Sequence, residues 1–177
     1  MSTTTWSIDP THSEILFKVK HLMINSVTGR FNKFEGQLTS TAEDFSGANI
    51  SFSADVASID TNMEMRDNHL RSDDFFAAEK YPQIRFSSTR FEKTGADTYR
   101  LTGDFTIRDI TRPIELAVEY QGTATDFYGN TKAGFELTGK ISRKEFGLVW
   151  NGVTESGGIV VGDEVKLTAN VQLKKEA

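Results

Sequence analysis

Hydrophobic residues at every second position, repeated along almost the whole chain, most limit how this sequence can fold. Such alternation places one face of a β-strand on a core and the other face in solvent. Phe17 and Val19, for example, share a face with His21, and lysines occupy the positions between them. Comparable stretches lie at 15–21, 31–38, 50–56, 84–88, 99–107, 114–120, 133–141 and 165–173. The pattern predicts an all-β protein of about eight strands.

Short polar connections that contain glycine separate neighbouring stretches, as at 94–97 and 126–130. Connections of this kind are typical of hairpin turns, so the strands are expected to form an antiparallel meander. Closing such a sheet removes its exposed edges, and about eight strands enclose room for side chains or one small ligand. We therefore predict an antiparallel β-barrel that forms one domain over residues 1–177.

One segment, at about residues 61–80, does not alternate. Its apolar residues fit helical spacing better, and Ser72-Asp73-Asp74 has the residue types that cap a second helical turn. Tyr81-Pro82 should end the helical region, because the residue before a proline avoids helical backbone angles. The segment is predicted to form one or two short helices that act as a lid or an end plug for the barrel.

Charge and composition exclude several classes of partner. The formal net charge is −5 and the pI is near 5.3, and no cluster of lysine and arginine is present for phosphate backbones or anionic membrane surfaces. We expect no nucleic-acid partner. No apolar run approaches the roughly 20 residues of a membrane-spanning helix, so the chain is not expected to span a membrane. Cysteine is absent, which excludes disulfides and thiolate chemistry.

The first residues, Met1 to Trp6, lack the basic start and apolar stretch of a secretory signal. As written, the chain is expected in the cytoplasm. A periplasmic location is the alternative if a signal segment once preceded this sequence.

Three sets of short motifs cover nearly the whole chain, and their order and spacing resemble the YceI-like, polyisoprenoid-binding family. The first set comprises Trp6-Ser7-Ile8-Asp9-Pro10-Thr11-His12-Ser13, Phe17-Lys18-Val19-Lys20-His21, Gly29-Arg30-Phe31 and Phe34-Glu35-Gly36. The second comprises Ser58-Ile59-Asp60-Thr61, Arg66-Asp67-Asn68-His69-Leu70, Ser72-Asp73-Asp74-Phe75-Phe76 and Tyr81-Pro82-Gln83-Ile84-Arg85-Phe86. The third comprises Gly103, Phe105-Thr106-Ile107, Thr111-Arg112-Pro113, Gly134-Phe135, Arg143-Lys144-Glu145-Phe146-Gly147 and Val161-Gly162-Asp163-Glu164-Val165.

The resemblance implies a lipocalin-like barrel whose elongated apolar cavity holds a long-chain isoprenoid or another amphiphilic lipid, such as a polyprenyl phosphate or a quinone. It also implies a binding protein without catalytic activity or a required cofactor, and a homodimer is one of its implied states. This chain departs from many members by starting directly at the domain. It also has alanine after the paired phenylalanines, where an acidic residue is frequent.

Large apolar side chains at inward positions are the candidate lining of the cavity. They are Phe17, Val19, His21, Phe31, Phe52, Phe75, Phe76, Phe86, Phe105, Ile107, Phe135 and Phe146. Phenylalanine buries a large area in a solid core as well as in a hollow one, so composition alone does not decide between them. Gly103 and Gly139 favour a hollow barrel, because a missing side chain leaves space or permits close backbone approach.

Four polar residues are candidates for contact with the head group of the lipid: His21, Arg66, Asp67 and His69. A cation, a carboxylate and an imidazole suit a phosphate or quinone head. Two alternatives stay open. His21 is equally expected to hydrogen-bond within the core or to lie at the rim of the barrel. An Arg66–Asp67 pair that only fixes the helix to the barrel is the more frequent arrangement.

Catalytic and metal sites are not predicted. His12 lies near Asp9 and Ser13, but residues so close on an extended chain point in different directions, and no nucleophile turn is present. His12, His21 and His69 lack the spacing of zinc sites. Two rivals to a lipid carrier remain: an enzyme that uses the candidate head-group residues on a bound lipid, and a solid-cored module that dimerises.

Overall fold

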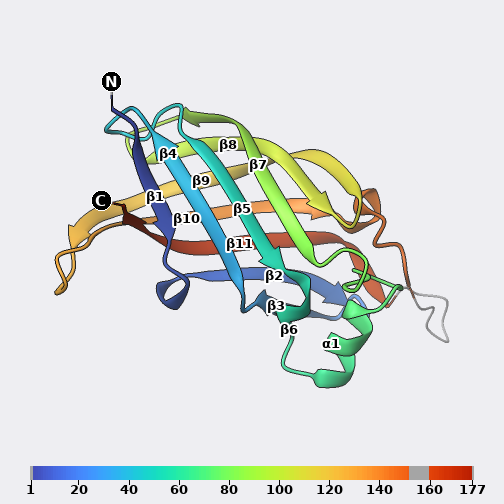
Figure 1. The fold of residues 1–177 in the computed structure, drawn as a ribbon. Helices are drawn as coiled ribbons and strands as arrows, with labels where there is room; N and C mark the ends of the chain where they lie inside the picture. The colour runs from blue at the N-terminus through green and yellow to red at the C-terminus, as the bar shows by residue number, and fades with distance from the viewer. Residues whose placement is uncertain (1, 152–159, 177) are drawn as a thin grey trace.

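Eight antiparallel strands close into a barrel in the computed structural model, which describes residues 2–151 and 160–176 (Figure 1). Strand β1 pairs on one side with β4 and on the other with β11, and this closes the ring. Around the ring the strands are β1 (Thr4–Ile8), β4 (Phe34–Ser40), β5 (Asn49–Asp55), β7 (Gln83–Lys93), β8 (Thr98–Ile107), β9 (Ile110–Thr125), β10 (Thr131–Ser142) and β11 (Val161–Lys175). The predicted all-β, lipocalin-like barrel is confirmed.

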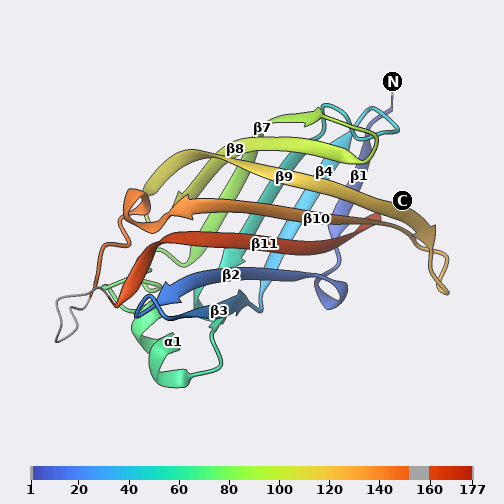
Figure 2. The ribbon, with the colours of Figure 1, turned by 180° about the vertical axis from the view of Figure 1, so that it is seen from behind.

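The barrel wall branches at β11. Near its end this strand pairs with β1, where Leu173 lies opposite Ile8, but its earlier part pairs with β2 (Glu14–His21), where Leu167 lies opposite Phe17. Strand β2 pairs with β3 (Asn25–Phe31), and β3 in turn pairs with the two-residue β6 (Ile59–Asp60). This branch extends the wall at the end of the barrel beside α1 (Figure 2).

Most strands agree in position with the alternating stretches, but β1 and β6 lie outside all of them. The stretch 31–38 is not one strand, because β3 ends at Phe31 and β4 begins at Phe34. From β4 to β11, the strands of the ring follow one another in chain order, as in a meander. Strand β1 pairs directly with β4, and the β2–β3 hairpin that separates them in the sequence pairs with β11 instead. The predicted turns at 94–97 and 126–130 join β7 to β8 and β9 to β10.

The helical insertion contains a single α-helix within the part of the chain that the structure describes. Helix α1 (Glu64–Arg71) is followed by turns, and Ser72 caps one of them by accepting a hydrogen bond from the Asp74 amide at 3.3 Å. Three short 3-10 turns lie elsewhere: η1 (Pro10–His12), η2 (Val56–Ser58) and η3 (Arg143–Phe146). None of the described helices is long and apolar enough to cross a membrane.

The ladder between β9 and β10 covers only part of the two strands. It runs from the Thr131–Thr125 pair to the Thr138–Ala117 pair. Beyond this point, Ile110–Leu116 of β9 pair with β8 alone, and Gly139–Ser142 of β10 pair with β11 alone. A surface groove lies over the same place, and Ile114 and Leu116 line both this groove and the interior of the barrel. Here a single layer of side chains separates inside from outside.

Candidate functional site

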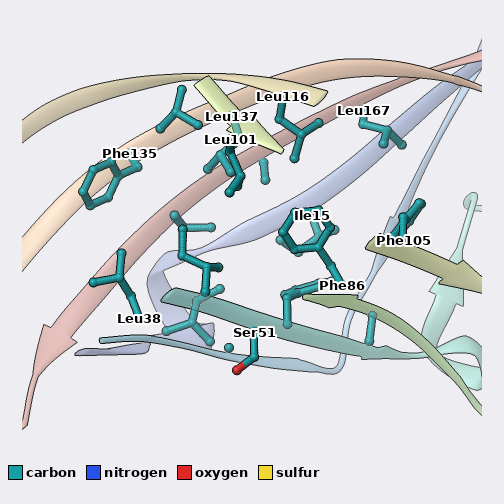
Figure 3. A pocket seen from close by; sticks show the side chains of 18 of the residues that line it. Ile15, Leu38, Ser51, Phe86, Leu101, Phe105, Leu116, Phe135, Leu137 and Leu167 are labelled. Carbon is teal, nitrogen blue, oxygen red and sulfur yellow. The ribbon is translucent and has the colours of Figure 1, made fainter. Parts of the chain in front are cut away.

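The interior of the barrel contains a cavity of about 180 Å³, which we call the barrel chamber. Figure 3 shows Leu101, Leu116 and Phe135 from one wall and Leu38 and Phe86 from the other, turned toward a shared space. They point inward because alternate residues of each strand face the same side. Among the lining residues that the structure describes, Gln37, Ser51 and Thr168 alone have polar side chains. The barrel chamber is therefore an apolar compartment.

A second cavity, of about 250 Å³, lies between the barrel and helix α1, and we call it the helix-side chamber. Its apolar lining comes from the strands, as with Val19 and Ile107, and from the insertion, as with Leu70, Phe75 and Phe76. Trp150 closes another side, and its ring lies 5.4 Å from that of Phe75. The helical insertion thus supplies one wall of the chamber.

The two chambers meet at a waist, defined here as the residues that line both: Phe17, Phe31, Ile84, Phe105 and Leu167. The rings of Phe17 and Phe31 lie 5.7 Å apart. Phe17 lies directly against Gly29 of β3, where an added Cβ would meet the ring at 2.2 Å. Glycine at this position lets the ring lie against the wall. The two chambers therefore adjoin each other, with aromatic rings at their common boundary.

Eleven of the twelve sequence-predicted lining residues lie on one chamber or the other. On the barrel chamber are Phe52, Phe86 and Phe135; on the helix-side chamber are Val19, His21, Phe75, Phe76 and Ile107; and at the waist are Phe17, Phe31 and Phe105. Phe146 belongs to neither chamber. It is fully buried behind the waist, with its ring 5.5 Å from that of Phe105.

The glycines expected to favour a hollow interior instead permit close packing. At Gly103 an added Cβ would meet Phe86 at 2.4 Å, and at Gly139 it would meet Leu116 at 2.4 Å. Neighbouring side chains thus fill the space that these glycines leave. The cavity follows from the closure of the barrel and not from the glycines.

Arg66 and Asp67 both bind Thr61, and they form no ion pair with each other. Buried Asp67 accepts hydrogen bonds from the Thr61 amide at 2.8 Å and the Thr61 hydroxyl at 2.5 Å. Arg66 donates to the hydroxyl and the carbonyl oxygen of Thr61, each at 2.7 Å. Both residues fix α1 to the barrel, and of the two only Arg66 also lines the helix-side chamber.

The two candidate histidines reach the helix-side chamber from different elements. His21 ends β2 and is half-buried. His69 lies on α1, where its Nε2 is 2.9 Å from an Asp74 carboxylate oxygen and its ring packs edge-on against Trp150 at 4.7 Å. Three of the four head-group candidates, His21, Arg66 and His69, therefore share one chamber.

A further cation of this chamber, Arg143, is buried at 3% exposure and is not among the residues that the sequence predicts for the site. It belongs to η3, and its guanidinium donates to four backbone carbonyl oxygens: those of Gly162 at 2.8 Å, Leu148 at 2.5 Å, Trp150 at 2.9 Å and Val161 at 3.1 Å. In the sequence Arg143 is only part of a family-like motif. Its burial depends on tertiary contacts that no local pattern reveals.

Charge is distributed unequally between the chambers. Lys20, His21, Arg66, His69 and Arg143 line the helix-side chamber, whereas no aspartate or glutamate does so among the described residues. The barrel chamber has no ionisable lining residue in the same part of the chain. Burial lowers the pKa of Arg143, and the negative charge of Asp163 opposes this effect, but arginine stays protonated in proteins. The ionisable lining residues thus lie at the helix end, although the surface exposed inside the helix-side chamber is almost wholly apolar.

No group of metal ligands occurs within residues 2–151 and 160–176. His12 pairs at 2.9 Å with Asp9, which also binds Lys132 at 2.5 Å, and this cluster lies outside both chambers. Burial opposes the charge of Asp9, but hydrogen bonds from Lys132, His12 and Thr11 outweigh it and hold the pKa of the carboxyl well below its usual range.

The closed ring of strands and its apolar interior define a lipocalin-like β-barrel protein. Residues 6–173 match the family model described as the YceI-like domain, and the chain belongs to this family. A UPF0312 protein of Staphylococcus epidermidis is 34% identical over 170 residues, which are 96% of either chain.

Two solved structures show the same fold. The YceI protein of Campylobacter jejuni is 31% identical, with a TM-score of 0.75 over 89% of this chain and 90% of its own. A polyisoprenoid-binding domain from Saccharophagus degradans is 16% identical, with a TM-score of 0.72 over 97% of this chain and 98% of its own. At that identity the second comparison concerns the fold alone.

Proposed function

We propose that this protein binds and carries one long-chain isoprenoid or similar amphiphilic lipid and does not change it chemically. The observation that carries the proposal is the pair of adjoining chambers inside the protein, both with an almost wholly apolar surface. Apolar contact contributes roughly 25 cal/mol for each Å² removed from water, so a long tail can bind tightly without a strong polar anchor.

The family supports this function. The domain from Saccharophagus degradans is described as polyisoprenoid-binding and has the same fold. Branched isoprenoid tails also suit a cavity with an aromatic waist, because their methyl groups offer many contacts to ring faces. Lipid transport, storage or protection would each follow from such binding.

A carrier without catalysis is also supported by the polar groups of the helix-side chamber. Asp67 is bound to Thr61, and His69 is paired with Asp74. In these arrangements each acidic group already holds a protein partner, and neither is directed at a nucleophile of the kind that hydrolases use.

Native mass spectrometry of the purified protein, followed by solvent extraction and identification of any released lipid, tests the proposal and also measures the oligomeric state. We expect one long-chain lipid for each chain. Protein that is empty after purification and takes up neither polyprenols nor quinones on reconstitution would contradict the proposal.

A matched pair of variants places the binding site. Ala169 lines the barrel chamber, so Ala169→Leu should fill part of it and reduce uptake of long-chain polyprenol at least several-fold. Ala117 is exposed on the outer face of β9, and Ala117→Leu makes the same change in volume outside the cavity. The outer variant should bind like the unmodified protein. Equal uptake by both variants would place the lipid elsewhere.

A further inference from the structure

We propose that the helix end of the barrel docks on a phospholipid bilayer, with which the protein exchanges its lipid. The docking surface is a set of exposed apolar side chains from three segments, which we call the helix-end patch. Its members are Leu22, Met23, Ile24, Met63, Met65 and Val149. The inference extends the proposed carrier function by naming the partner, and docking can be measured independently of lipid uptake.

The side chains of the helix-end patch face solvent, although each of them is large and apolar. Ile24 is 82% exposed and Met65 is 83% exposed. Leu22 to Ile24 form the turn between β2 and β3, and Met63 and Met65 lie at the start of α1. This turn and α1 lie side by side at one end of the barrel (Figure 1, Figure 2). Exposed apolar residues that gather at one place mark a surface that binds a partner.

The turn between β2 and β3 contains residues that its backbone disfavours. Leu22 and Met23 are its central residues, with φ of 53° and 58°, and the Ile24 amide donates to the His21 carbonyl at 3.3 Å. Asparagine and glycine favour such a turn, whereas bulky apolar side chains are costly at positive φ. Strain of this kind is typical of positions where function requires particular side chains. The exposed Leu22 and Met23 therefore indicate a role beyond folding.

The two strands that carry this turn are basic. Lys18, Lys20 and Arg30 are exposed on β2 and β3, and the sequence has no aspartate or glutamate from residue 15 to residue 34. The net charge of the whole chain, −5, disfavours an anionic partner, but this hairpin departs from that average. Lysine and arginine beside a bilayer are attracted to anionic lipid head groups. An apolar tip on a basic hairpin thus suits a membrane surface.

A bilayer fits the helix-end patch better than a folded protein does. The patch residues project from three separate segments, and none of them lines either chamber or the outer groove. A protein partner must match the shape that it binds, whereas a fluid bilayer closes around separate side chains. Glu64 is exposed between Met63 and Met65, and a carboxylate stays in water. The hairpin turn is therefore the part that we expect to enter the bilayer.

The helix-end patch lies at the end of the barrel that holds the helix-side chamber. His21, just before the turn, lines this chamber, and the Leu22 amide donates at 2.7 Å to the carbonyl of Val160, another lining residue. Trp150 lines the chamber next to the exposed Val149. The segments that would contact the bilayer are thus segments that enclose the chamber. Docking would bring the apolar interior close to the source of its lipid.

Flotation of the full chain with vesicles that contain no isoprenoid tests the docking. We expect binding to phosphatidylcholine vesicles, and tighter binding when phosphatidylglycerol is added. Ile24→Ser combined with Met65→Ser should reduce binding at least tenfold, because two apolar side chains are lost from the contact. Phe127→Ser is the matched control, since Phe127 is fully exposed in the turn between β9 and β10 at the opposite end of the barrel. A greater loss in the control would overturn the inference.

Leu22→Asn combined with Met23→Gly separates docking from folding. Because the turn prefers these residues, we expect a thermal midpoint equal to or above that of the unmodified protein, together with at least tenfold weaker vesicle binding. A lower midpoint with unchanged vesicle binding would show that the two side chains stabilise the fold and do not dock. Self-association that both double variants abolish, in a protein that binds no vesicles, would assign the patch to a second copy and overturn the bilayer.

Uptake of polyprenol from a detergent dispersion distinguishes docking from the carrier function. Uptake without vesicle binding would overturn the docking and leave the carrier function intact. Vesicle binding without uptake would support the docking and overturn the carrier function. Where both occur, the two double variants should take up polyprenol from vesicles at least tenfold more slowly than the unmodified protein, with unchanged uptake from detergent. Equal rates from vesicles would contradict a role of the patch in lipid exchange.

Discussion

Single residues decide where charge can exist in this barrel. Asp9 shows this at the edge of the fold, where Lys132, His12 and Thr11 stabilise its carboxylate. The pKa of Asp9 is lower in the folded protein than the ordinary value of about 3.9 in an unfolded chain. The carboxylate therefore contributes stability above about pH 4, and that contribution is lost as the pH falls toward the folded pKa.

Asp9→Asn should remove this contribution. We expect a lower free energy of unfolding at neutral pH by about 2 kcal/mol, the usual range for hydrogen bonds to a charged group, and a smaller difference from the unmodified protein near pH 3. Urea unfolding of both proteins at the two pH values measures this difference in the free energy of unfolding. Asp104→Asn, at an exposed position on β8, is the control. If the difference in free energy of unfolding between the two proteins grew as the pH falls, the Asp9 carboxylate would not be the stabilising group.

At the scale of elements, Thr61 joins α1 to the barrel. Thr61→Val keeps the shape of the side chain but removes the hydroxyl that binds Arg66 and Asp67. Leaving buried polar groups with fewer partners costs about 1–3 kcal/mol. We expect that loss of stability, together with faster hydrogen exchange in residues 61–71.

Thr106→Val is the matched control for this change, because its hydroxyl pairs with Thr111 on the outside of the barrel. A surface substitution of this kind should change stability by less than about 0.5 kcal/mol. Hydrogen exchange in α1 that is equally fast in both variants would show that Thr61 does not anchor the helix.

Elements can be predicted from the sequence wherever the alternation is long. Strands such as β8 and β10 have many inward apolar residues, and the pattern locates each of them. Strand β1, Thr4–Ile8, escapes prediction because only Trp6 and Ile8 alternate in it. The branch at β11 also escapes prediction, because one strand exchanges neighbours along its length, which depends on distant pairing and not on local sequence.

The candidate site divides in the same way. Phenylalanines of the lining can be predicted, since inward direction follows from strand period. Arg143 cannot, because its partners are carbonyl oxygens of residues up to 19 positions away. Asp67 is a head-group candidate in the sequence because it lies next to Arg66, but the helix turns its carboxylate to Thr61 instead.

At the scale of the whole molecule, the proposed carrier function requires a long tail to extend from one chamber into the other across the waist. Phe17 lines both chambers and lies against Gly29. An added methyl group at Gly29 would displace the ring, because its carbon would lie 2.2 Å from the nearest ring atom, far below van der Waals distance. The ring would have to move away from β3, and Phe17 is itself a residue of the waist.

Gly29→Ala should therefore weaken binding of geranylgeraniol, whose tail is twice as long, more than binding of geraniol. We expect a loss of at least fivefold for the long ligand and less than twofold for the short one, measured by calorimetry. Gly134→Ala is the control, because its nearest neighbour would lie 3.7 Å from the new Cβ. Equal losses for both ligands would mean that the substitution disturbs the fold, and no loss for either would mean that the tail does not cross the waist.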